Sequence, residues 1–144
     1  MALEGEYEPS TSRWVRDQVA LYERTGGAEG GTAVGRPVVV VTSRGARSGR
    51  LRKNPVMRVE HDGVYAAVAS QGGAPGHPAW FHNLVAHPVV ELQDGPERHE
   101  YTARLATGEE RAVWWERAVE AFPRYAEYAR ATAREIPLFL LERR

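Results

Sequence analysis

The sequence predicts an α+β protein, in which a small antiparallel β-barrel has helices packed around it. Three observations support this fold class. Strand-like segments follow one another as hairpins, and the regular strand–helix alternation of a parallel sheet is missing. Short amphipathic segments with helical periodicity lie before, between and after the strands. The 144 residues, 42% of them hydrophobic, are enough for one domain with its own core.

The chain is expected to be one domain with two parts. Residues 1–36 provide an N-terminal helix and a glycine-rich loop, and residues 37–144 form the barrel. Val15, Val19 and Tyr22 have the i, i+4, i+7 spacing of one buried helical face. A glycine pair follows this helix and ends it.

The middle of the chain is predicted from turn signals. The apolar run at 37–43 indicates a buried strand, and the tripeptide at 61–63 is typical of a hairpin turn between two further strands, 54–60 and 64–70. Pro78 suits the first turn of a short helix, which continues until His87 and Pro88.

The C-terminal third begins with the clearest hairpin, residues 89–105, which has Asp94 and Gly95 in its turn. Thr107 and Glu110 have the spacing of a capping box, so a helix is expected there and is expected to stop at Pro123. A second short helix covers 124–134. The last strand, 136–142, is expected at a sheet edge because it contains Pro137.

Composition excludes several functions. The chain has no cysteine, which excludes disulfides, thiolate metal sites and thiol catalysis and is compatible with a reducing cytoplasm. Its 19 basic and 19 acidic residues argue against a general nucleic-acid binder. The acidic N-terminus lacks an apolar signal core, and the longest apolar runs are strand-sized, so we expect a cytoplasmic protein without a transmembrane segment.

Familiar site motifs are missing as well. The glycine segments match neither the dinucleotide-binding fingerprint nor the P-loop, and no serine lies in a nucleophile elbow. His77, His82 and His87 are spaced so that each is turned about 140° from the last around a helix, which prevents a shared metal-facing side. We therefore expect no metal.

Residues 43–55, SRGARSGRLRKNP, form a basic segment with five positive side chains and no carboxylate. Gly45 and Gly49 flank a turn that leaves backbone N–H groups free to point at an anion. Arg52 and Lys53 follow on the next strand, and arginine can bind phosphate or carboxylate through two parallel bonds. A solvated hairpin connection is the alternative interpretation.

A second glycine cluster, ASQGGAPGHP at 69–78, follows a strand and precedes a helix. Gly72 and Gly73 would allow a planar ring or a phosphate close to the backbone, and the helix N-terminus adds a positive dipole end. A plain flexible connection explains this segment equally well. Together, the two segments suggest an elongated, multiply charged ligand with a flat end.

Three segments, at 42–56, 69–88 and 122–137, resemble the deazaflavin-dependent nitroreductase family of actinobacteria. Members have a split β-barrel related to FMN-binding oxidoreductases and use coenzyme F420, which carries a phosphate, a tail of glutamates and a flat tricyclic ring. The resemblance implies coenzyme contacts at Ala46, Arg47, Ser48, Arg52, Lys53, Asn54, Pro55, Val56, Met57, Val68, Ala69, Ser70, Gln71, Ala79, Trp80, Phe81, His82 and Asn83.

The sequence departs from its relatives at several positions. Arg47 and Gln71 stand where lysine is common, and the loss of a charge at 71 would weaken tail binding or change the preferred tail length. Tyr125 and Tyr128 lie on one helix face. The resemblance directs them toward the substrate, as catalytic residues that orient it or supply a proton, whereas core packing is the alternative. Trp14 is expected to cover the pocket.

The function expected from the resemblance is hydride transfer from reduced F420 to a quinone, a nitro compound or a conjugated enone. An FMN-dependent oxidoreductase of the same fold and a non-catalytic coenzyme-binding protein are the alternatives. A small nucleic-acid binder is disfavoured because the basic segment contains no aromatic residue for base stacking. The expected partner is a small-molecule electron acceptor; a monomer, a homodimer and peripheral membrane contact are all compatible with the sequence.

Overall fold

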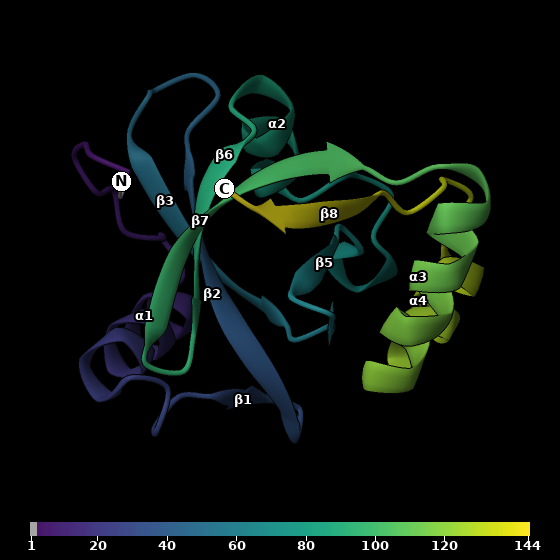
Figure 1. Ribbon diagram of the computed structural model, residues 1–144, viewed down its shortest axis with the longest axis horizontal. Coiled ribbons are helices and arrows are strands. Elements are labelled where there is room, and N and C mark those ends of the chain that lie inside the picture. The colour runs from purple at the N-terminus through teal and green to yellow at the C-terminus, as the bar shows by residue number, and fades with distance from the viewer. Residues whose placement is uncertain (1–2) are drawn as a thin grey trace.

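A curled antiparallel sheet organises the chain, as the computed structural model of residues 3–144 shows (Figure 1). Within this range eight strands join in the order β1-β2-β6-β7-β8-β5-β4, and β3 pairs with β2 beside that path. The strands are β1 Thr32–Ala33, β2 Arg36–Arg44, β3 Leu51–Met57, β4 Glu60–His61, β5 Val64–Val68, β6 Val89–Asp94, β7 Glu97–Leu105 and β8 Leu138–Arg143.

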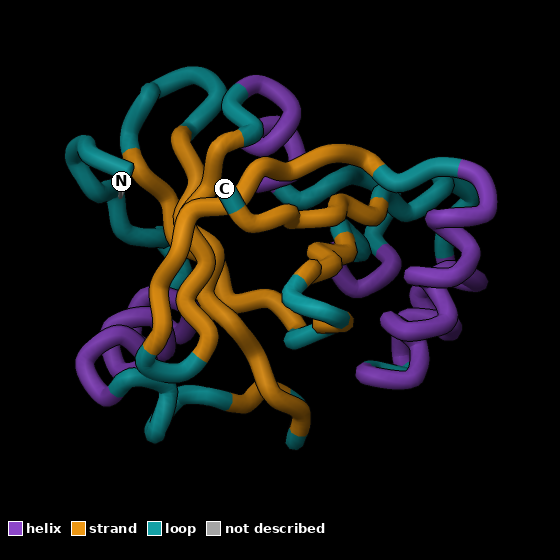
Figure 2. The backbone as a smooth tube through the Cα atoms, viewed as in Figure 1, coloured by secondary structure: helices purple, strands orange, loops and turns teal. Residues whose placement is uncertain are grey.

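Helices cover the outside of the sheet (Figure 2). They are α1 Arg13–Thr25, the short 3-10 helix η1 Gln71–Gly73, α2 Ala79–Ala86, α3 Gly108–Ala121 and α4 Arg124–Ala131. In Figure 1, α3 and α4 lie together at one side, whereas α1 lies at the other. The expected α+β barrel architecture is confirmed. Among the described residues, no helix is long and apolar enough to cross a bilayer.

Strand β2 is buried on both faces, which explains its continuous run of valines. Val39 and Val41 point into the barrel core, whereas Val38 and Val40 pack against α1. Successive side chains of a strand point to opposite faces, so a strand covered on both sides needs apolar residues at every position. A third cluster, which includes the buried Trp114, holds α3 and α4 against β5 and β8.

Two sequence expectations about the C-terminal third are wrong. Strand β8 lies between β7 and β5 rather than at an edge. Pro137 is tolerated because it precedes the first strand residue, where its carbonyl still accepts from Ala69 N at 2.9 Å. The capping box is also absent: Thr107 is the N-cap of α3, but its side chain caps no N–H group. Glu110 instead accepts from the guanidinium of Arg104 at 2.7 and 2.8 Å.

The hairpin of β2 and β3 carries the basic segment to the end of the sheet where α2 lies (Figure 1). Strand β3 starts at Leu51, earlier than the sequence indicated, so that Arg52, Lys53 and Asn54 are all part of the ladder with β2. This register decides which of these side chains face the same way.

Candidate functional site

A cavity of about 790 Å³ opens between the turn of the basic segment, strand β3 and the start of α2. Many of the residues expected to contact a coenzyme lie together on its wall, although they come from segments far apart in the sequence. Glu8, Gly45 and Pro78 also line it and were not expected. The full lining is Glu8, Gly45, Ala46, Arg47, Ser48, Arg52, Asn54, Gln71, Pro78, Ala79, Trp80, His82 and Asn83.

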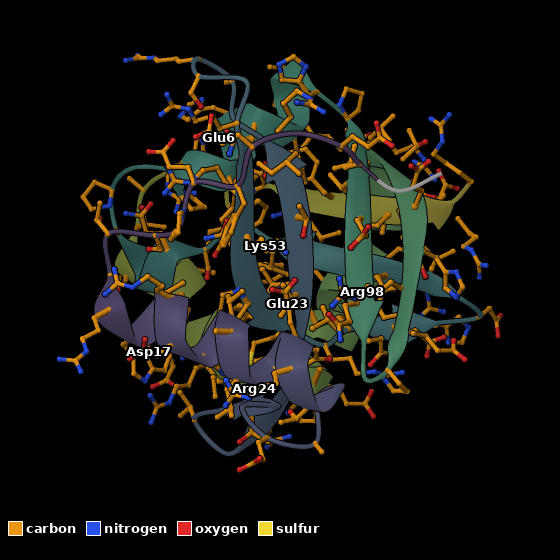
Figure 3. All side chains as sticks on the ribbon, turned by 90° about the vertical axis from the view of Figure 1, so that its left-hand side faces the viewer. Glu6, Asp17, Glu23, Arg24, Lys53 and Arg98 are labelled. Carbon is orange, nitrogen blue, oxygen red and sulfur yellow. The ribbon has the colours of Figure 1, made fainter. Side chains whose placement is uncertain are left out.

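Strand β3 separates Arg52 from its neighbour Lys53. Arg52 and Asn54 face the cavity. Lys53 points to the opposite face, where its Nζ lies 2.5 Å from Glu23 of α1 and 4.9 Å from the centroid of the Tyr7 ring. Figure 3 shows Lys53 and Glu23 close together, with Arg98 approaching the same carboxylate at 3.8 Å. Of the two neighbouring cations on β3, Arg52 therefore lines the cavity and Lys53 does not.

The other expected contacts lie behind the wall rather than on it. Val56 lines a small apolar recess that adjoins the cavity, since Asn54 and Trp80 border both. Phe81 packs against Phe139 of the barrel core, with ring centroids 5.6 Å apart. The remaining residues of this group are buried or pack within the sheet: Pro55, Met57, Val68, Ala69 and Ser70.

Most cations of the basic segment already have partners. Arg44 donates to two backbone carbonyls, Lys53 is paired with α1, and Arg50 and Arg52 contact acidic side chains near the N-terminus. Within residues 3–144, Arg47 is the one cation of this segment without such a partner. Its exposed guanidinium, on the cavity wall, is available to an anionic ligand.

The turn at the cavity is held in shape by α2. Asn83 is buried, accepts a hydrogen bond from Ala46 N at 2.9 Å through its Oδ1, and donates to Ser43 Oγ at 3.4 Å. Gly45 suits this turn, because a Cβ there would lie 2.7 Å from Ser48 Oγ, which would have to turn away, and 3.2 Å from the carbonyl oxygen of Arg50. The backbone N–H groups of Arg47 and Ser48 have no acceptor among the residues described. Free N–H groups beside an unpaired arginine suit a phosphate or a carboxylate.

The second glycine segment is organised by Arg134, a residue that sequence reasoning missed. Its guanidinium donates to the carbonyl oxygens of Ala69, Ser70 and Ala74 at 3.2, 2.7 and 3.0 Å. It also lies 2.9 Å from Nδ1 of His77, which accepts because arginine can only donate. Desolvation and the neighbouring Arg134 lower the pKa of His77, so its ring is neutral at pH 7 and able to accept.

The two candidate tyrosines lie outside the cavity wall. Tyr125 is 4% exposed and packs on Phe122, with ring centroids 5.0 Å apart, in the cluster under α3 and α4. Burial, followed by the nearby Tyr128, raises the pKa of Tyr125. Tyr128 is partly buried, and its backbone lies 3.1 Å from where a Cβ on Gly73 would be. Trp14 is 65% exposed on α1 and is not among the lining residues.

Comparison with known proteins decides the family. A family model described as F420H(2)-dependent quinone reductase matches residues 14–143. The chain belongs to this family. An F420H(2)-dependent quinone reductase of Mycobacterium tuberculosis is 33% identical over 146 residues, which cover 92% of this chain and 98% of that protein. The resemblance inferred from the sequence is therefore confirmed, and the protein is an oxidoreductase that depends on coenzyme F420.

One solved structure supports the same assignment, and a second is similar in sequence and fold. An F420-H2-dependent reductase, FDR-A, is 53% identical with a TM-score of 0.71, over 74% of this chain and 95% of that one. A protein described as a domain-swapped dimer is 48% identical with a TM-score of 0.73, over 92% of this chain and 100% of its own.

The residues present fit F420. The coenzyme's phosphate and glutamate tail are anions, which match Arg47, Arg52 and the free N–H groups of the turn. Its flat ring system matches the aromatic surface that Trp80 provides on the cavity wall. A Cβ at position 45 would crowd Ser48 and Arg50 within this turn, so the glycine lets the turn keep its shape.

Proposed function

We propose that this chain reduces a quinone, or a similarly activated nitro compound or enone, with F420 bound in the cavity beside α2. The observation that carries this proposal is the combination of an unpaired arginine, free backbone N–H groups and an aromatic wall in one cavity. When bound, the reduced coenzyme supplies the hydride. The protein's task is to bind, orient and shield it.

Each part of the wall has a proposed role. Arg47 and the N–H groups of the turn hold the phosphate or the first tail carboxylate, and Arg52 holds a further anion. Asn83 keeps the turn in its binding shape, and Trp80 borders the ring. Lys53, which faces α1, contributes by fixing strand β3 against that helix.

The partners and location follow from the same observations. The proposed partner is a small-molecule acceptor and not nucleic acid, since the cations of the basic segment are largely paired within the protein. We propose a cytoplasmic protein, in keeping with its lack of cysteine. Because one structural relative is described as a domain-swapped dimer, a homodimer is the proposed assembly.

Titration with F420 and with FMN tests the cofactor directly. We expect F420 to bind more tightly than FMN by roughly threefold or more, because FMN has a single phosphate and leaves Arg52 without a tail anion. A charged hydrogen bond corresponds to about 1.5–3 kcal/mol, and the competing ion pair of Arg52 with Glu8 reduces the net gain. Fluorescence quenching measures both dissociation constants. Comparable or tighter FMN binding would favour the flavin alternative. Binding of F420 without reduction of any quinone, nitro compound or enone would indicate a coenzyme carrier.

Replacing Tyr125 with phenylalanine tests whether this residue takes part in the reaction. Its raised pKa keeps the phenol protonated through neutral pH, and its hydroxyl has no partner within residues 3–144. We expect kcat and KM for a quinone to stay within about threefold of wild type, because only an unpartnered hydroxyl is lost. A drop in kcat of about 100-fold would instead identify a proton donor. A rise in KM alone would identify a group that orients the acceptor.

A further inference from the structure

The N-terminal segment, residues 3–8, passes the start of strand β3 and pairs with it at Leu51. Tyr7 and Leu51 form a parallel bridge. Glu8 N donates to Leu51 O at 2.9 Å, and Leu51 N donates to Glu6 O at 2.8 Å. The segment thus extends the sheet by a short parallel pairing, and this fixes which of its side chains face the cavity.

Alternation along the extended segment places Glu6 and Glu8 on the same side, with Tyr7 on the other, over Lys53. Arg50 Nε lies 3.6 Å from Glu6, and its Nη1 lies 3.8 Å from Glu8. Arg52 Nη1 lies 3.3 Å from Glu8, which itself lines the main cavity. Figure 3 shows Glu6 near the turn of the basic segment, well away from the Lys53–Glu23 pair.

These contacts put glutamate carboxylates on Arg52, which would receive the tail, and on Arg50, two positions before it on the chain. Two carboxylates in alternate positions of an extended strand stand roughly 7 Å apart. Glu6 and Glu8 therefore present to Arg50 and Arg52 the same kind of group, spaced carboxylates, that a polyglutamate tail presents. A tail carboxylate that reaches either arginine must first displace a group identical to itself.

We propose that Glu6 and Glu8 are specificity-determining residues that limit how strongly the protein favours long coenzyme tails. The inference rests on the proposed function, since it requires F420 to bind in this cavity. The carboxylates are 76% and 38% exposed, so each ion pair is weak enough for a ligand to displace. A tail carboxylate forms an ion pair with the arginine only by breaking the arginine's ion pair with Glu6 or Glu8. The net attraction for each added tail glutamate is therefore small.

The test compares the double variant Glu6→Gln/Glu8→Gln with wild type. One ligand is F420 with several tail glutamates; the other is its phosphate-bearing precursor without glutamates. We expect the double variant to bind the long-tailed coenzyme roughly 3- to 30-fold more tightly, with a change of less than about twofold for the precursor. The gain should shrink as salt is added, because exposed charges are screened.

The matched control is Glu109→Gln/Glu127→Gln, which removes the same charge from exposed positions on α3 and α4. An equal gain in this control, or an equal gain for the precursor, would attribute the effect to net charge and overturn the inference. Unchanged or weaker binding of the long-tailed coenzyme by the double variant would overturn it as well. Failure of wild type to bind either deazaflavin would instead refute the proposed function, and the inference with it.

Discussion

Replacing Arg134 with alanine is expected to destabilise the protein and to weaken coenzyme binding together. The guanidinium holds three carbonyls and His77 of the second glycine segment. Hydrogen bonds to a charged group are worth about 1.5–3 kcal/mol each but are not additive, so we expect a total loss near 3 kcal/mol. For a chain of this size, that corresponds to a fall in melting temperature of roughly 6–12 °C.

Coenzyme binding should weaken because Gln71, which lines the cavity, belongs to the segment that Arg134 holds. Calorimetry and coenzyme titration measure the two effects. Arg130→Ala is the matched control, since Arg130 is an exposed arginine in the last turn of α4, and it should change stability by less than about 1 kcal/mol. Arg134→Lys should recover only part of the loss, because an ammonium lacks the planar fork. An Arg134→Ala protein that melts like wild type would contradict this account.

Removing Arg47 is expected to have the largest effect on coenzyme affinity. Its guanidinium has no protein partner among residues 3–144, so its full charge is available to an anion on the cavity wall. We expect Arg47→Ala to weaken F420 binding by about 1.5–3 kcal/mol, or roughly 10- to 150-fold. Arg52→Ala should weaken it less, because Arg52 must first leave Glu8.

Fluorescence titration at two salt concentrations distinguishes this from a general change in charge. Arg24→Ala, on the exposed side of α1, is the control that alters net charge away from the cavity. The penalty for losing Arg47 should be smaller in 1 M salt than in 0.1 M, as the Debye length falls from about 10 Å to about 3 Å. If Arg47→Ala and wild type bound F420 with equal affinity, the basic segment would be a solvated surface turn that does not hold the coenzyme.

The sequence by itself determined the fold class and the family. Tight turns have strong local signals, such as Asp94 and Gly95, and the i, i+4, i+7 spacing of Val15, Val19 and Tyr22 depends only on helix geometry. The glycines of the basic segment indicated an open turn for the same local reason, and the structure places an anion-suited cavity there. Three separated motifs were enough to indicate the coenzyme.

Only the tertiary structure decided which cations of the basic segment face the cavity and which are paired with acidic side chains. From the sequence, Arg47, Arg52 and Lys53 were all expected to contact the coenzyme. In the structure, one strand register sends Arg52 to the cavity and Lys53 to α1. The acidic residues that neutralise them lie on the N-terminal segment and on α1, and no local pattern indicates such pairings.

Contacts between different elements also decided the positions that local rules misjudged. Pro137 lies next to an interior strand because β7 and β5 pair on either side of β8, a matter of topology. Glu110 binds Arg104 instead of capping its helix, since the guanidinium offers a charged partner that the sequence spacing does not show. Arg134 meets its loop across more than fifty residues of chain. Hydrogen bonds of this kind form only once packing has brought the partners together, so a one-dimensional pattern cannot contain them.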